Sequence, residues 1–242
     1  MMLKALKSVP IFILLAVGLS GCFDLTQSVS LNRDGSGTYA MAIAVEGPMG
    51  EAMKKDNKSD DMHFGHNPKL VSRTKTTIVD GKVTKTGEVD FKTLSDLDLS
   101  NETVAIKVKG HDLFGLGSTH AIFRRSFLVG NEMRDRNQKT EDDERGKAIL
   151  ASIFGGHSYV FRVRLPGSID WIAPVYAGGI EVKPQVTSDA GGHTVVWRMP
   201  LLSMIESKAL HFSVGFSSYG ALADSETTLD KKSDDHTDTD GN

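Results

Sequence analysis

The sequence has little cysteine: Cys22 is the only one in 242 residues. A single thiol cannot form an intrachain disulfide. The sequence also cannot contain the metal-binding and redox motifs that need two cysteines, such as C-x-x-C. Aromatic residues are also few, at 7%. A domain built from this chain must therefore be stabilised by a core of aliphatic and phenylalanine side chains rather than by covalent links.

The chain also lacks a strong charge of one sign. Its 28 basic and 31 acidic residues give a formal net charge of −3 at pH 7. A nucleic-acid-binding surface is normally strongly basic, so we expect no nucleic-acid partner. The N-terminal apolar run, residues 9–19, is too short to be a membrane-spanning helix, which needs about 20 residues.

The first 22 residues are organised like an export signal. Residues 1–7 contain two lysines and no acid, and the apolar run follows, which is the order of a signal peptide. The run ends in L-S-G-C at 19–22, which resembles the lipobox of bacterial lipoproteins. The resemblance implies cleavage before Cys22, a diacylglyceryl thioether on its sulfur and an acylated amine, for example with palmitate. The alternative is an uncleaved anchor with a buried cysteine.

The residues after Cys22 bear on sorting if the source has an outer membrane. Phe23 comes first and Asp24 second, whereas lipoproteins retained at the inner membrane tend to carry an acid directly after the cysteine. We therefore expect a protein anchored by lipid on the exported side of the cell membrane, in the outer membrane and facing the periplasm in a Gram-negative source.

Composition divides the chain into three parts. We expect a signal peptide over residues 1–21, a single domain over 22–222 and a disordered acidic tail over 223–242. From Asp224 onwards the tail contains one aliphatic residue, Leu229, among many acids, which is typical of disorder. Its H-T-D-T-D-G stretch is too short for an EF-hand calcium loop, which needs about twelve residues and a terminal Glu.

Alternation of apolar and polar residues dominates the domain, and this period of two indicates strands. The expected strands are 27–32, 38–45, 70–79, 82–91, 104–110, 120–129, 158–167, 179–186, 193–201 and 209–218. Asp34-Gly35 and Asp80-Gly81 predict hairpin turns. Helices are expected at 48–55 and 140–154. The predicted fold class is α+β: a predominantly antiparallel, twisted sheet with one or two helices packed on it.

Two stretches resemble the LppM-like bacterial lipoprotein domain. They are GCFDLTQSVSLNRDGSGTYAMAIAV, from Gly21, and YVFRVRLPGSIDW…HTVVWRMPL…ALHFSVGFSS, from Tyr159. The resemblance implies an envelope-exposed α+β domain for which lipid binding has been suggested, and it carries over no catalytic residue. The chain departs from members that end in a transmembrane helix, because residues 201–222 contain Glu206, Lys208 and His211, which are costly in hydrocarbon.

We find no catalytic or metal-binding motif. Ser36 lies in Gly-Ser-Gly, but a nucleophile elbow needs G-x-S-x-G between a strand and a helix, and this turn joins two strands. His63 and His66, beside two aspartates, could offer ligands to zinc, yet a zinc site needs about four convergent donors. We therefore expect no metal and no cofactor.

The candidate binding residues are arginines on predicted strands. Besides Arg124, these are Arg162, Arg164 and Arg198, which alternate away from the apolar positions of their strands. If the two strands are neighbours, the last three share one sheet face. Guanidinium groups suit phosphate or carboxylate, so this set could bind an anion or a lipid head group. The alternative is a solvated face with cross-strand ion pairs.

The expected function is that of a non-enzymatic envelope lipoprotein, held at the membrane by the lipid on Cys22, that binds another envelope component such as a lipid, an amphiphile or a protein. One alternative is a structural lipoprotein that supports an assembly. Another is an envelope hydrolase whose catalytic groups are scattered along the sequence. An apolar cavity, an exposed apolar patch, or a cleft with convergent His, Asp and Ser would favour lipid binding, assembly or hydrolysis, respectively.

Overall fold

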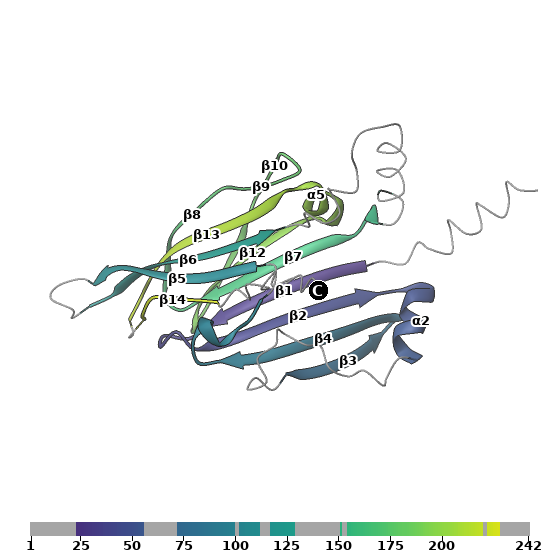
Figure 1. Cartoon of the computed structure of the whole chain (residues 1–242), viewed down its shortest axis with the longest axis horizontal. Coiled ribbons are helices and arrows are strands. Elements are labelled where there is room, and N and C mark those ends of the chain that lie inside the picture. Colours follow the sequence, from purple (N-terminus) through teal and green to yellow (C-terminus); the bar gives the residue numbers. More distant parts are fainter. Residues whose placement is uncertain are drawn as a thin grey trace, which may run out of the picture.

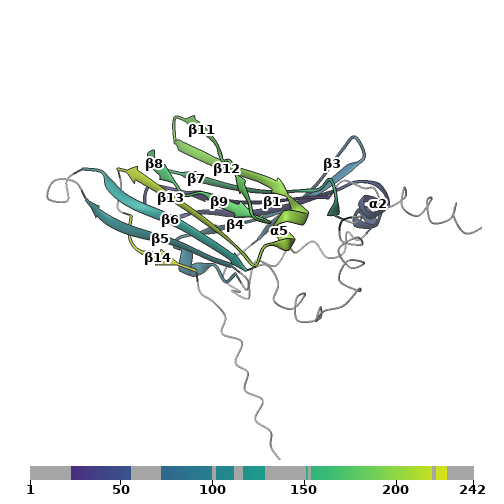
Figure 2. The ribbon, with the colours of Figure 1, turned by 90° about the horizontal axis from the view of Figure 1, so that it is seen from above.

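The computed structural model describes residues 23–55, 72–99, 102–111, 117–128, 151, 154–219 and 222–227. These residues form two open β-sheets, one of seven strands and one of five, and a separate two-stranded ribbon. The two large sheets lie one over the other (Figures 1 and 2). The expected α+β class, with mainly antiparallel sheets and two helices packed on them, is confirmed.

The seven-stranded sheet has the order β11-β12-β7-β1-β2-β4-β3. Its strands are β1 (Phe23–Leu31), β2 (Gly37–Val45), β3 (Arg73–Val79), β4 (Lys82–Phe91), β7 (Ser158–Leu165), β11 (Gln185–Asp189) and β12 (Gly192–Pro200). All neighbouring pairs are antiparallel except β1 and β7. This parallel pairing joins the start of the domain to a segment far along the chain, so the central strand of the sheet comes from its N-terminal end.

The five-stranded sheet has the order β14-β5-β6-β13-β8. Its strands are β5 (Glu102–His111), β6 (Thr119–Leu128), β8 (Ser168–Ile172), β13 (Ala209–Ser218) and β14 (Ser225–Glu226). The ribbon consists of β9 (Val175–Ala177) and β10 (Ile180–Val182), and the helices are α2 (Gly47–Lys55), α5 (Leu201–Glu206) and the short 3-10 turn η1 (Leu94–Asp96).

Both predicted hairpins are present, and the glycines explain their turns. Gly35 has φ 84° in the turn between β1 and β2, while Asp80 and Gly81 have φ 50° and 79° between β3 and β4. At Asp80-Gly81, positive φ at both central residues is the conformation of a two-residue hairpin loop whose twist matches the strands. Helix α2 confirms the expected helix at 48–55 and packs on β4, where Gly50 lies against Val45 and Val83.

The core lies between the inner faces of the two sheets. Phe161 of β7 stacks on Trp197 of β12, with ring centroids 5.7 Å apart, and contacts Phe212 of β13 at 4.7 Å. Phe123 of β6 stacks on Phe161 from the five-stranded sheet at 6.4 Å. All four side chains are buried. Because successive residues of a strand point to opposite faces, each of these side chains lies on the inner face of its sheet.

Two expected boundaries are wrong. The expected strand 179–186 is divided at Lys183-Pro184 into β10 and β11, which belong to different sheets, and strands β8 and β9 were not expected. The disordered tail does not begin at 223, because Ser225 and Glu226 pair with β5 and Thr227 is buried.

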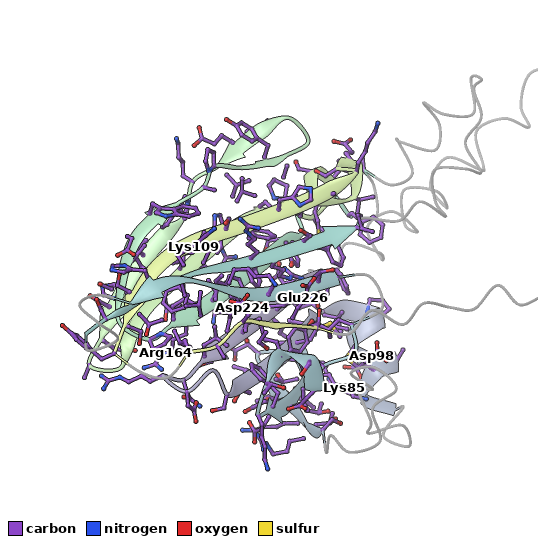
Figure 3. The ribbon with its side chains drawn as sticks, turned by 60° about the vertical axis from the view of Figure 1, so that its left-hand side comes forward. Lys85, Asp98, Lys109, Arg164, Asp224 and Glu226 are labelled. Carbon is purple, nitrogen blue, oxygen red and sulfur yellow. The ribbon has the colours of Figure 1, made fainter. Side chains whose placement is uncertain are left out.

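The acids at the start of the expected tail take part in this pairing. Asp224 accepts a hydrogen bond from the backbone N–H of Val108 at 2.7 Å. Lys107 lies 3.9 Å from the Asp224 carboxylate and 3.8 Å from that of Glu226. Figure 3 shows Asp224 and Glu226 beside the five-stranded sheet. Residues 222–227 are therefore an edge of the domain, which their charge alone did not suggest.

Candidate functional site

The predicted arginine face is formed by the neighbouring strands β7 and β12. Arg162 pairs with Val196, Arg164 with Thr194, and Arg198 with Val160. Directly paired residues of an antiparallel pair point to the same face, so the three guanidinium groups share the outer face of the seven-stranded sheet. Arg162 and Arg198 are diagonal neighbours across the two strands, at a separation that long side chains can bridge.

Arg164 is already engaged in this structure. Its Nη2 donates to Asp189 Oδ1 at 2.8 Å, and its Nε lies 3.4 Å from Oδ2. The hydrogen bonds from Arg164 and from the backbone of Gly191 lower the pKa of the Asp189 carboxyl. The alternative of a cross-strand ion pair thus describes Arg164, which Figure 3 labels.

The two remaining arginines are available to a ligand. Arg198 is exposed and makes one hydrogen bond, from Nη1 to Ser158 Oγ at 3.2 Å. Arg162 is exposed, and among the described residues it has no hydrogen bond or ion pair. The geometry therefore reduces the predicted set of three to the pair Arg162 and Arg198.

Small side chains surround Arg162 on this face. Ser28 of β1 stands in register with it, and Ala40 of β2 pairs with Ser28. The next side chains in the same row are Glu88 of β4 and Arg73 of β3, and Arg73 donates to Glu88 at 2.9 Å. The row beside Arg162 thus contains the small side chains of Ser28 and Ala40. The nearest acid in that row, Glu88, already accepts a hydrogen bond from Arg73.

A second cluster, which the sequence reasoning missed, lies between the sheets. Arg125 of β6 is fully buried, and its Nε donates to Glu102 Oε2 at 2.5 Å. Its Nη1 donates to the Tyr159 hydroxyl at 2.6 Å, and its Nη2 donates to Gln27 Oε1 at 2.5 Å. The Tyr39 hydroxyl donates to the other oxygen of Glu102 at 2.5 Å. The members of this buried polar cluster are Gln27, Tyr39, Glu102, Arg125 and Tyr159.

Burial and neighbouring groups shift the pKa values of Arg125, Tyr39 and Tyr159 in the buried polar cluster. Burial opposes the charge on Arg125, but Tyr159 and Glu102 outweigh it and raise the pKa of the guanidinium. Burial, aided by the Glu102 carboxylate, raises the pKa of Tyr39 well above its ordinary value. Burial also raises the pKa of Tyr159, although Arg125 acts in the opposite direction. Both tyrosines are therefore neutral hydrogen-bond donors at neutral pH.

The sequence contained a signal for this cluster. Arg125 stands in the same alternating register as Ala121, Phe123 and Phe127, and Gln27 stands in register with Val29 and Leu31. A polar residue at an apolar position of a strand points into the core, where it needs partners.

A third cluster joins Ser217, His120 and Asp170 on the outer face of the five-stranded sheet. Ser217 of β13 pairs with His120 of β6, and its Oγ lies 2.7 Å from Nδ1 of that imidazole. The same Oγ lies 2.8 and 2.7 Å from the two carboxylate oxygens of Asp170 on β8. Three strands thus bring together a hydroxyl, an imidazole and a carboxylate.

The connections within this cluster differ from those of a Ser-His-Asp triad. In a triad the carboxylate holds the imidazole nitrogen that faces away from the serine. Here Asp170 binds the serine itself, and its Oδ2 is 3.6 Å from Nδ1, the nitrogen that already faces Ser217. The arrangement therefore links the three strands but leaves the far imidazole nitrogen without an orienting carboxylate from Asp170.

The remaining candidates from the sequence are either outside the described residues or, like Ser36, part of a turn. Cys22, His63 and His66, and nearly all of the expected helix 140–154, lie outside the described residues. Ser36 is a turn residue whose N–H and hydroxyl both donate to Asp34 Oδ1, at 3.0 and 2.6 Å. Within the described parts of the chain, no group of three or more metal-ligating side chains converges. No helix in those parts is both long and apolar enough to cross a bilayer.

The chain is similar in structure to a known protein, but it matches no family model. No curated protein matches it either. Among solved structures, the chain is similar to the NMR structure of the folded domain of the Mycobacterium tuberculosis protein LppM (Rv2171). The similarity covers 83% of this chain and 94% of that chain, with a TM-score of 0.36 and 8% sequence identity.

Proposed function

We propose that this chain is a non-enzymatic envelope lipoprotein, anchored through lipid on Cys22, whose domain binds an anionic envelope component such as a phospholipid or another amphiphile. The observation that carries the proposal is the pair Arg162 and Arg198, exposed on one face of two adjacent strands. Guanidinium groups side by side suit a phosphate, because each can donate two parallel hydrogen bonds.

The anchor is supported by the order of charges, apolar run and L-S-G-C in the first 22 residues. Two or three acyl chains on one residue hold a protein firmly at a bilayer, whereas one chain gives marginal binding. In cells fed labelled palmitate, we expect the parent protein to become labelled and to sediment with membranes. Cys22→Ser should remain unlabelled and unprocessed. Equal labelling of the two forms would refute the anchor.

The ligand site is tested with soluble short-chain lipids, because the anchor itself would bind any vesicle. The mature protein is placed in phosphatidylcholine nanodiscs and titrated with dihexanoyl phosphatidylglycerol by calorimetry. We expect binding of this anionic lipid to weaken about tenfold in Arg162→Gln/Arg198→Gln, since a hydrogen bond to a charged group contributes about 1.5–3 kcal/mol and exposure reduces it.

Arg33→Gln/Arg124→Gln is the matched control. It removes the same charge from two exposed positions, one in the β1–β2 turn and one on the other sheet, and it should bind like the parent. Dihexanoyl phosphatidylcholine, which carries no net charge, should bind weakly to all three proteins. Equal affinities of the two double variants for the anionic lipid would reject the arginine site.

An envelope hydrolase is the second candidate, because Ser217, His120 and Asp170 come together. It ranks second because Asp170 contacts the serine rather than the far side of the imidazole ring. A fluorophosphonate probe that reacts with activated serines distinguishes the two functions. Labelling of the parent that is lost in Ser217→Ala would favour the hydrolase, and we expect no such labelling.

A further inference from the structure

One end of the seven-stranded sheet combines the start of the domain with an apolar hairpin tip. Phe23 pairs with Val45, Val45 with Val83, and Val83 with Ile78. These four residues form a row across β1, β2, β4 and β3. Because neighbouring strands are about 4.8 Å apart, Ile78 lies about 14 Å from Phe23 along the row.

The tip of the β3–β4 hairpin lies just beyond this row. Val79 pairs with Lys82, and Asp80 and Gly81 form the turn. The side chain of Lys82 reaches back to Asp24 of β1, with Nζ 2.9 Å from Oδ2. Figure 1 shows the β3–β4 turn, helix α2 and the first residues of β1 at the same end of the molecule. The hairpin tip therefore lies at the same end of the sheet as Phe23, the residue that directly follows Cys22.

The tip exposes apolar side chains on both of its faces. Ile78 is 53% exposed and Val79 is 60% exposed, and successive residues of a strand point to opposite faces. Lys75, on the same strand, is exposed as well. Asp80 occupies the turn itself, which suits the depth of lipid head groups and opposes entry into the hydrocarbon.

The opposite end of β1 has a different character. The turn between β1 and β2 consists of polar and small residues only, Asn32, Arg33, Asp34, Gly35 and Ser36. β1 contains nine residues, and a strand rises about 3.3 Å per residue, so this turn is about 30 Å from the anchored end. The apolar tip and the polar turn thus face opposite ways along the sheet.

We propose that the β3–β4 hairpin rests on the bilayer surface beside the anchor, with Ile78 and Val79 among the lipid head groups, so that the β1–β2 turn points away from the membrane. The inference rests on the proposed lipidation of Cys22, because the acyl chains bring the start of β1 to the bilayer. The tip then acts as a second, shallow contact that fixes the tilt of the domain.

Single introduced cysteines test this orientation. Acylation uses the only natural thiol, so Val79→Cys or Arg33→Cys can be labelled selectively with an environment-sensitive fluorophore. Each labelled lipoprotein is reconstituted into vesicles of phosphatidylcholine and phosphatidylglycerol that contain a lipid with a head-group quencher. We expect at least threefold stronger quenching at position 79 than at position 33. Equal quenching at the two positions, with both proteins floating with the vesicles, would overturn the hairpin contact.

A second variant separates this contact from the anchor. Ile78→Glu in the Val79→Cys protein should still float with vesicles, because the anchor is intact, but quenching of its label should fall towards the value at position 33. Ile78 is exposed, so the thermal transition should match that of the parent. Unchanged quenching would contradict the proposal. If no labelled protein floats, the anchor is refuted, and the orientation is refuted with it.

Discussion

The guanidinium of Arg125 lies 4.3 Å from the ring centroid of Phe161. Arg125 belongs to the five-stranded sheet and Phe161 to the seven-stranded sheet, so this contact crosses the interface between them. A desolvated cation over an aromatic face contributes about 2 kcal/mol, and the hydrogen bonds to Gln27 and Tyr159 also cross the interface. Arg125 therefore connects the two sheets both by a cation–π contact and by hydrogen bonds.

Removing Arg125 should strongly destabilise the domain. Arg125→Ala leaves the Glu102 carboxylate buried without its partner, and breaking a buried ion pair in this way costs about 3–5 kcal/mol. Arg124→Ala is the neighbouring control, since Arg124 is exposed and should change stability by less than about 0.5 kcal/mol. Urea unfolding followed by the fluorescence of the two tryptophans, Trp171 and Trp197, measures both stabilities.

The double variant Arg125→Met/Glu102→Gln tests whether the loss comes from the unpaired charge. It removes both charges, so it should recover part of the stability that Arg125→Ala loses. Equal stabilities of Arg125→Ala and Arg124→Ala would contradict the role assigned to the buried polar cluster.

Acid should weaken the contact between β1 and β7 through Asp24. Burial opposes ionisation of this carboxyl, but hydrogen bonds from Lys82 and Ser158 outweigh it and hold the pKa below the ordinary value of 3.8. A lowered pKa stabilises the fold above that ordinary value, and the contribution is lost as the pH falls through the lowered pKa. Asp24→Asn should therefore be less stable than the parent at pH 6, and the difference should shrink as the pH falls below 3.8. A stability difference that does not change with pH would argue against this assignment.

Raising the pH above about 10 should reduce the stability that Tyr159 contributes in the buried polar cluster. Its phenol donates to Gln27 Oε1 at 2.6 Å, and burial raises its pKa above 10.0. A raised pKa stabilises the fold below the unfolded value of about 10, and that contribution is lost as the pH rises further. Tyr159→Phe should cost about 1–3 kcal/mol at pH 7 and less at pH 11, measured by urea unfolding. A cost that grows with pH would exclude this model.

Gly37 should resist even a methyl group. A Cβ at this position would lie 2.0 Å from the carbonyl oxygen of Ser30 and 2.7 Å from the ring of Phe91. Gly37→Ala should therefore cost about 1–3 kcal/mol, as overpacking does. Gly110 has nothing within 4 Å of the same position, so Gly110→Ala should be neutral to within about 0.5 kcal/mol. Similar melting temperatures for the two variants would show that β1 and β2 can separate to admit the methyl group.

The positions of the strands were predictable from the sequence where one face of the strand is buried and the other is exposed to solvent. The stretch 209–218 alternates Leu210, Phe212, Val214 and Phe216 with polar or small residues, and it forms β13 with those bounds. The stretch 179–186 was wrongly predicted to be one strand, because Ile180, Val182 and Val186 also stand at alternate positions. Its Lys183-Pro184 step ends one strand before another begins, since proline cannot donate to a sheet ladder.

The candidate site was predictable only in part, because it depends on which strands are neighbours. Alternation placed Arg162 and Arg198 away from the core, and the β7–β12 pairing then brought them together. The partner of Arg164 was hidden, because Asp189 lies on β11, a strand that the sequence pattern merged with β10. The convergence of Ser217, His120 and Asp170 likewise required two separate strand pairings, β6 with β13 and β13 with β8, to be known.

The sequence by itself determined the lipobox-like start, the two hairpin turns and, in strands that alternate clearly such as β13, the face on which each residue lies. All of these depend on residues near one another in the chain. Tertiary structure alone decided that β1 pairs in parallel with β7 and that Arg125 finds Glu102, Gln27 and Tyr159 across the two sheets. Pairing between distant strands depends on how whole faces pack, because a buried charge is tolerated only where several elements supply its partners together.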